Sequence, residues 1–149
     1  MRCDCHMHMI LDGVEWKRAI HRHSERPDEP WIRERLKTYQ GLGFTYLRDG
    51  GDRWGAGAKA RELAGGYGIR YRTPLAPLCK AGHYGAFIGE KYGNFREYTE
   101  LVRKARTDGA DFIKIMISGL MDFDRFGVLT QPGYPAQEIR ELIHIAHEE

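Results

Sequence analysis

Short apolar segments alternate with longer amphipathic ones along the chain, and glycine or proline marks each change of pattern. This alternation is typical of repeated strand–helix units, and four such units are predicted. The loop after the third strand, residues 76–93, is unusually long and rich in glycine. The expected strands are 2–9, 44–48, 69–75 and 111–118, and the expected helices are 12–23, 31–40, 56–64, 94–108 and one around 139–146.

The alternation also restricts the fold. Helices of ten or more residues between short strands imply right-handed crossovers, and therefore a parallel sheet covered by helices. Two architectures meet this condition, an open doubly wound sheet and part of a (β/α)8 barrel. In both, chemistry is expected at the carboxyl ends of the strands. No linker or low-complexity segment divides the chain, so residues 1–149 are expected to form one domain.

Composition excludes several classes of protein. The 149 residues are 42% hydrophobic and 30% charged, as in an ordinary soluble domain. No apolar run approaches the roughly 18 residues that span a bilayer, and the chain does not open like a signal peptide, which predicts a cytoplasmic protein with no membrane partner. A formal net charge of +2 gives no strong field to hold nucleic acid. Three cysteines, an odd number, predict no disulfide framework.

The first expected strand carries a candidate metal site. His6 and His8 lie two residues apart, so both imidazoles project from one face at the end of the strand, within reach of one metal ion. The alternative is a pair of packed or half-exposed histidines. A zinc site that uses Cys3, Cys5 and Cys79 is disfavoured, because the first two thiols would point away from the histidines.

Lys114 interrupts the most apolar of the expected strands, residues 111–118. A buried ammonium must be paired, lose its proton or be chemically modified, because an unpaired buried charge is costly. One interpretation is an ion pair with Asp4, Asp49 or Asp111. The other is a functional lysine inside the site.

Further candidates follow the second and third expected strands. His83 and Tyr84 lie in the long loop and are candidates for binding a carboxylate or carbonyl of a small-molecule substrate, with plain loop packing as the alternative. Arg48 and Asp49 end the second strand. They are expected to pair with each other or to orient the metal-binding histidines.

Three segments together resemble a known family. Residues 4–8, Asp-Cys-His-Met-His, resemble the D-x-H-x-H first-strand motif of the amidohydrolase superfamily, which comprises metal-dependent hydrolases built on a (β/α)8 barrel. Residues 45–51 resemble the T-x-x-R-D-x-G segment of its imidazolonepropionase-like and prolidase-like branches. Residues 109–116 are similar to the G-A-D-x-I-K-I fourth-strand segment. The resemblance implies a TIM-barrel type α/β fold, of which this chain would hold the first four βα units, a half barrel.

The resemblance also implies a chemistry. Its members hold two divalent metal ions, usually zinc. His6 and His8 would bind the more buried ion, and Lys114, carboxylated by CO2, would bridge both. A hydroxide activated by the metals would then hydrolyse an amide, peptide-like or cyclic amide C–N bond. The aspartate that delivers the proton follows the eighth strand in the family, so no catalytic residue is assigned within this chain.

The end of the chain limits this expectation. The sequence stops at Glu149 in acidic residues without a glycine, in or just after the fourth unit, which predicts a truncation and an inactive isolated chain. One alternative is therefore a non-catalytic half-barrel fragment that associates with itself through exposed sheet edges. Another is a metal-dependent phosphoesterase or nuclease of similar fold. Lys114 argues against it, because the common nuclease members have glutamate there, and the near-neutral charge argues against a DNA substrate.

Overall fold

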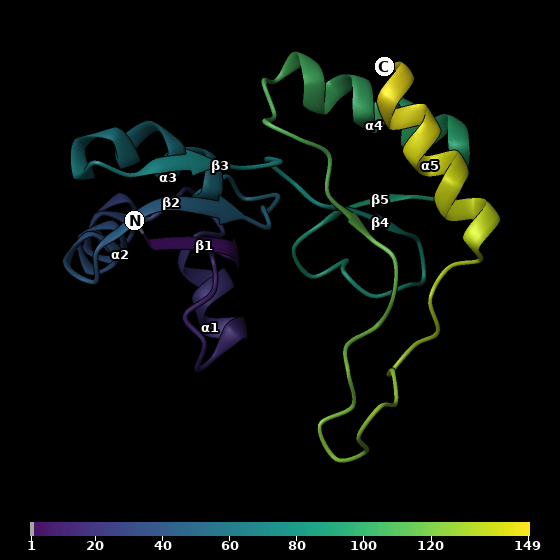
Figure 1. Cartoon of the computed structure of the whole chain (residues 1–149), viewed down its shortest axis with the longest axis horizontal. Coiled ribbons are helices and arrows are strands. Elements are labelled where there is room, and N and C mark those ends of the chain that lie inside the picture. Colours follow the sequence, from purple (N-terminus) through teal and green to yellow (C-terminus); the bar gives the residue numbers. More distant parts are fainter. Residues whose placement is uncertain (1) are drawn as a thin grey trace.

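A computed structural model describes residues 2–149, which form two separate parallel sheets of three short strands each. The strand order is β1-β2-β3 in the first sheet and β5-β4-β6 in the second. Figure 1 shows α2 and α3 with the first sheet and α4 and α5 above the second. The elements are β1 (Arg2–Met7), α1 (Trp16–Arg22), α2 (Glu29–Gly41), β2 (Phe44–Asp49), α3 (Ala56–Ala64), a 3-10 turn (Gly65–Tyr67), β3 (Arg70–Arg72), β4 (Leu78–Lys80), β5 (Glu90–Tyr92), α4 (Phe95–Thr107), β6 (Ile115–Met116) and α5 (Ala136–Glu148).

The expected half barrel of four successive βα units is wrong, because the strands form two small sheets. The third expected strand, 69–75, shrinks to Arg70–Arg72, and the fourth, 111–118, shrinks to Ile115–Met116. The segment 76–93, expected to be a loop, supplies β4 and β5. Long, continuous strands are therefore confined to β1 and β2.

The break between the sheets lies between β3 and β4 and has a local cause. Pro74 and Pro77 have no N–H to donate to a ladder. Leu75 between them has a φ of 64°, in the left-handed region that side chains rarely adopt. Its carbonyl accepts the N–H of Asp52 at 2.8 Å. The chain therefore turns away from the first sheet before it enters the second.

Asp111 ties the two sheets together at this break. Its carboxylate accepts the backbone N–H of Thr73 at 2.9 Å and the Arg72 guanidinium at 2.5 Å, and Arg61 lies 3.4 Å away. Its own N–H donates to the Thr73 carbonyl at 2.9 Å. Burial raises the pKa of Asp111, but the Thr73 hydrogen bond and the two guanidinium groups outweigh it and lower the pKa overall. The segment that leads to Lys114 is thus fixed against the end of β3.

The helices form close to where the amphipathic pattern predicts them, and side chains cap the starts of α2 and α4. Asn94 accepts the N–H of Glu97 at 3.0 Å, and the Glu97 carboxylate accepts the N–H of Gly93 at 2.6 Å. This reciprocal cap fixes the start of α4. Asp28 caps α2 through the N–H of Trp31. The expected helices over 31–40, 56–64, 94–108 and 139–146 are confirmed to within a few residues.

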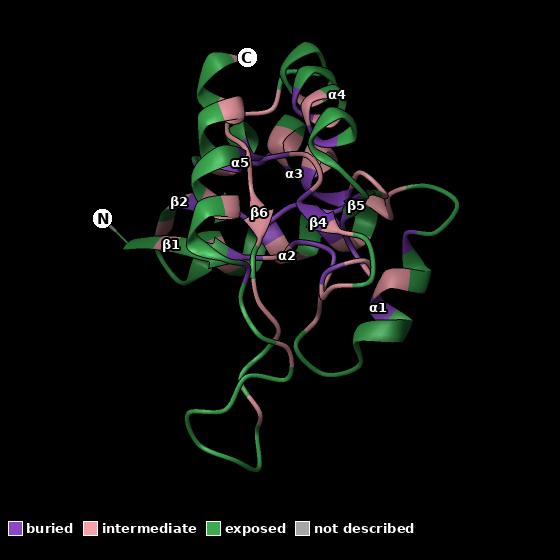
Figure 2. Cartoon of the chain, turned by 90° about the vertical axis from the view of Figure 1, so that its right-hand side faces the viewer, coloured by how far each residue is buried: buried purple, intermediate pink, exposed green. Residues whose placement is uncertain are grey.

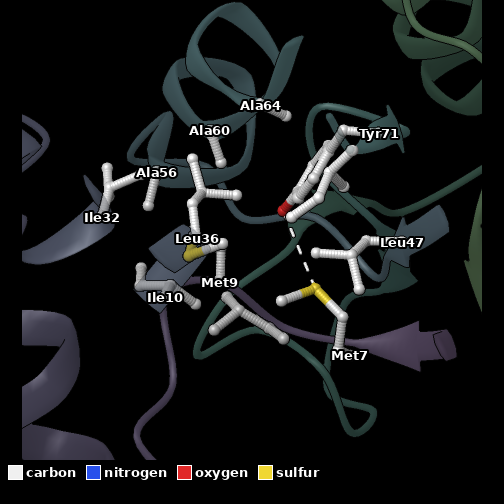
Figure 3. Packing of buried hydrophobic residues seen from close by; sticks show 12 residues of the cluster. Met7, Met9, Ile10, Ile32, Leu36, Leu47, Ala56, Ala60, Ala64 and Tyr71 are labelled. Carbon is white, nitrogen blue, oxygen red and sulfur yellow. Dashed lines mark hydrogen bonds between the residues drawn. The ribbon is translucent and has the colours of Figure 1, made fainter. Parts of the chain in front are cut away.

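Each sheet has its own hydrophobic cluster. The first lies between β1–β3 and the helices α2 and α3 (Figure 3), where the Tyr71 hydroxyl donates to the sulfur of Met7 at 3.7 Å. The second packs α4 and α5 on the other sheet. Figure 2 shows buried residues within both bodies and an exposed loop that leaves them between β6 and α5. The second cluster comprises Leu78, Tyr92, Tyr98, Val102, Tyr134 and Leu142.

Two further findings concern membrane-spanning helices and the cysteines. Over residues 2–149, the structure has no helix that combines the length and the apolarity needed to cross a membrane. The three cysteines are free thiols, as expected, with Cys3 and Cys5 exposed and Cys79 buried.

Replacement of Asp111 by alanine is expected to lower the free energy of unfolding by about 2 kcal/mol, because it leaves the Thr73 N–H and two guanidinium groups without their acceptor. Urea denaturation measures the change. The matched control is Asp108→Ala, which removes an exposed carboxylate paired with Lys104 on α4 and should cost less than about 0.5 kcal/mol. Equal losses in the two variants would show that Asp111 does not join the sheets.

Candidate functional site

A cavity of about 950 Å³ opens along β1 and contains four of the residues singled out by the sequence. His6 lies in β1 and His8 just after it, Lys114 directly precedes β6, and Tyr84 lies between β4 and β5; all four line the cavity. One wall is α2, and the opposite wall is the segment 114–120. This β1 cavity is the candidate functional site.

The two histidines face the β1 cavity because of the strand alternation. Met7, between them, is buried in the first cluster, while the rings of His6 and His8 lie with centroids 5.4 Å apart. The His8 Nδ1 is 3.2 Å from the Gly51 carbonyl oxygen. A Cβ on Gly50 would come within 2.3 Å of the His8 ring, so glycine is needed there to leave room for the imidazole. The backbone of Gly50 and Gly51 therefore packs against the His8 ring.

Burial and neighbouring charges lower the pKa of both imidazoles. The pKa of His8 is lowered mainly by burial and further by the charge of Lys114, although the contact with Gly51 opposes the shift. The pKa of His6 is lowered by burial, by Lys114 and by His8. A neutral imidazole is the form that binds a metal. Burial therefore favours the form of both histidines that can bind a metal ion.

Lys114 is half-buried and has no carboxylate partner. None of the ion pairs within residues 2–149 includes it, so the expected pair with Asp4, Asp49 or Asp111 is not formed. Asp111 is instead bonded to Arg72 and Thr73, as described above. Burial and the charge of Arg48 both lower the pKa of Lys114. Both effects favour the neutral, nucleophilic amine.

The structure separates the two expected substrate-binding residues. Tyr84 lines the β1 cavity, and its backbone N–H donates to the Gln131 side chain at 2.6 Å. The His83 ring lies edge-on against Tyr134, with centroids 5.0 Å apart, and is not among the residues that line this cavity. Only Tyr84 is therefore placed beside the histidines and Lys114.

Arg48 and Asp49 do not pair with each other, because their side chains leave opposite faces of β2. The Arg48 guanidinium lies 4.1 Å from the centre of the Phe112 ring. Asp49 is only 1% exposed and accepts the N–H of Met9 at 3.3 Å and the hydroxyl of Thr73 at 3.0 Å. Asp49 thus holds the backbone that follows His8 rather than the imidazole itself.

Asp52 is a second buried carboxylate, which the sequence reasoning missed. It accepts the N–H groups of Trp54, Ala56 and Gly57 at 2.9, 3.0 and 2.8 Å, and so caps α3. Burial raises the pKa of Asp49 to about 6, and burial together with Asp49 raises that of Asp52 to about 6. The available signal was an acidic residue shortly before the helix start.

The donors of the β1 cavity fit a metal ion only in part. Two neutral imidazoles suit zinc, which usually takes at least three protein ligands. No group of three or more His, Cys, Asp or Glu that could hold a metal is found among residues 2–149. His6 and His8 therefore form part of a ligand set, and an unmodified Lys114 ammonium would repel a cation.

Comparison with known proteins supports the fold. No protein-family model and no curated protein matches the chain. A crystal structure described as an uncharacterized protein aligns with a TM-score of 0.66 at 19% identity, covering 98% of this chain and 39% of its own. A prolidase complexed with N-methylphosphonate-L-proline aligns with a TM-score of 0.63 at 20% identity, covering 98% of this chain and 40% of its own. The chain thus shares the fold of these structures and spans about two fifths of their length.

Alanine at Gly57 is expected to destabilise the protein by about 3 kcal/mol, because its Cβ would lie 1.9 Å from the Asp49 carboxylate. Gly41, the last residue of α2, has open space around it, so Gly41→Ala should be neutral or stabilising by up to about 1 kcal/mol. Urea denaturation compares the two variants. A gain in stability for Gly57→Ala would contradict the close packing of Asp49 on α3.

The buried carboxylate of Asp49 is also expected to make stability depend on pH. Because its folded pKa is about 6 and its ordinary value is 3.8, the folded state binds the proton more tightly. Stability should fall as the pH rises from about 4 to about 6 and then level off. Asp49→Asn should flatten this slope in urea denaturation repeated across the pH range. Parallel curves for the two proteins would mean that Asp49 is not desolvated.

Proposed function

We propose that this chain is part of a metal-dependent hydrolase that cleaves a C–N bond in a small amide or peptide-like substrate. One observation carries the proposal: His6, His8 and Lys114, from opposite ends of the sequence, line a single cavity. The fold shared with part of a prolidase supports it. That prolidase was crystallised with N-methylphosphonate-L-proline, which favours an N-substituted amino acid as the substrate class.

We propose that His6 and His8 hold one divalent ion, zinc in the first instance, and that a second ion shares Lys114. The Gly51 carbonyl fixes the Nδ1 side of His8, which directs its Nε2 to a ligand. Bound zinc would supply Lewis-acid polarisation of the scissile carbonyl and an acidified water. Among residues 2–149, no group of three or more His, Cys, Asp or Glu surrounds a single point where a metal could bind.

Carboxylation of Lys114 would remove the charge conflict at the site. The neutral Nζ attacks the carbon of CO2, one proton leaves to solvent, and the product is an anionic carbamate. The half-burial of Lys114, its lowered pKa and its lack of a carboxylate partner support this step. A carbamate offers oxygen ligands in place of a repelling ammonium.

The walls of the β1 cavity would position the substrate. Tyr84 is the polar group on the wall formed by the 76–93 segment, and we propose that its hydroxyl donates to a substrate carboxylate or carbonyl. Trp31, Phe87 and Met116 line the cavity as well and would exclude water from the bond to be cleaved. His83 packs on Tyr134 and would act on substrate only through the loop it shares with Tyr84.

A second candidate is a non-catalytic chain that binds metal weakly through His6 and His8 alone. The incomplete ligand set and the coverage of two fifths of the prolidase favour it. Metal content and carbamate content distinguish the two candidates, because only the first requires Lys114 to be modified.

The purified chain is expected to retain zinc, and the double change His6→Asn with His8→Asn should abolish retention, as measured by elemental analysis after dialysis in neutral buffer. The control is His144→Asn with His147→Asn, which removes two exposed imidazoles from α5. Retained zinc in the first variant would contradict the proposed site.

Labelled bicarbonate provides a second readout. A carbamate resonance in NMR that disappears in Lys114→Arg but persists in Lys80→Arg supports carboxylation at Lys114. Zinc retention without any carbamate would leave the non-catalytic candidate as the better description.

A further inference from the structure

The loop between β6 and α5 projects from the body of the protein as an arm, here residues 119–133 (Figures 1 and 2). The two segments of the arm are hydrogen-bonded to each other. The Gly119 N–H donates to the Gln131 carbonyl at 3.2 Å, the Thr130 N–H donates to the Leu120 carbonyl at 2.8 Å, and Met121 forms an antiparallel bridge with Leu129. The arm is therefore a structured hairpin-like projection.

The tip of the arm is organised by a single carboxylate. Asp122 accepts the N–H groups of Asp124 and Arg125 at 2.9 and 3.1 Å, and it also accepts the Arg125 guanidinium at 2.7 Å. The Asp122 N–H donates to the Val128 carbonyl at 2.7 Å. The polar groups of the tip thus satisfy one another within the arm.

The aromatic side chains of the tip are exposed to solvent. Phe123 is 95% exposed and Phe126 is fully exposed. Met121, at the base of the tip, is 51% exposed. Large apolar side chains held outward by a bonded turn mark an interaction surface rather than a disordered loop.

The β1 cavity of the same chain is complementary to this tip. Its wall on α2 carries Trp31 and Tyr39, and the facing side carries Phe87. It runs along β1, the edge strand of the first sheet, whose free side is unpaired. Apolar walls of this kind accept aromatic side chains.

Charge complements shape. Arg35 lines the β1 cavity and takes part in none of the ion pairs within residues 2–149. Asp124 at the tip of the arm is exposed and equally unpaired in the described chain. The arm starts from the wall 114–120 of its own cavity and extends away from both sheets (Figure 1), so the matching cavity is that of another copy.

We infer that two copies of this chain exchange arms, with Phe123 and Phe126 of each seated in the β1 cavity of the other. The contact repeats by two-fold symmetry, so both arms and both cavities are used. Asp124 of the second copy then brings a carboxylate to the cavity of His6, His8 and Lys114, where residues 2–149 of one copy offer no third metal-binding group. A seated arm fills the space proposed above for the substrate, so the exchanged dimer is a closed form of the site, and the inference needs neither bound metal nor catalysis.

Sedimentation equilibrium tests the arm exchange. The wild-type chain should be a dimer, and Phe123→Ser with Phe126→Ser should weaken dimerisation by about a thousandfold or more, because four buried rings are lost per dimer. The control is Val14→Ser, since Val14 is 92% exposed but lies outside the arm and the cavity lining. A monomeric wild type, or an unchanged dimer in the phenylalanine variant, overturns the inference.

A photo-crosslinking amino acid at position 126 locates the contact. In an equimolar mixture with isotopically heavy chain, light–heavy adducts are expected on residues 31–44 or 6–13, which line the β1 cavity. Adducts confined to one chain, or on α4 and α5, overturn the inference. Wild-type chain that co-sediments with phosphatidylcholine vesicles as a monomer overturns it as well, because the tip would then be a lipid anchor.

Discussion

The Asp49 carboxylate is shared by three parts of the first sheet and its helix. It accepts the N–H just after His8, it accepts the Thr73 hydroxyl at the end of β3, and it lies against the α-carbon of Gly57 in the first turn of α3. Burial of a carboxylate without hydrogen bonds is costly. The folded protein therefore has to keep the hydrogen bonds that Met9 and Thr73 donate to it. The position of His8 depends on this arrangement, because Asp49 fixes the strand end from which the imidazole projects.

Helices were predictable here because their information is local. The amphipathic stripes and the caps at Asp28 and Asn94 lie within a few residues of the structure they specify. Sheet continuity was not predictable in this way. The apolar pattern of 69–75 favours a strand, but Pro74 and Pro77 remove two donors and Leu75 adopts a left-handed conformation that no apolar pattern reveals. The expectation of one continuous sheet failed at those residues.

The candidate site was likewise predictable only where it depends on local sequence. Strand alternation alone predicted that His6 and His8 share one face, and the structure brings both to the cavity while Met7 is buried in the first cluster. Lys114 and Tyr84 reach the cavity of these histidines through contacts between distant segments. The hydrogen bonds of Asp111 to Thr73 and Arg72 are examples. The separation of Arg48 from Asp49 could not be derived from their adjacency, because Arg48 has an aromatic partner 64 positions away, at Phe112.

The two hydrophobic clusters have no buried residue in common, and the β1 cavity takes its histidines from the first sheet and Lys114 from the segment that enters the second. Its width is therefore set by how firmly the two bodies are joined, at Asp111 and where Ile88 and Met116 pack against the first cluster. A ligand that contacted both sides would add a further connection between the two sheets. Part of its binding free energy would then oppose the separation of the two sheets. Occupancy of the site would therefore raise the free energy of unfolding of the chain.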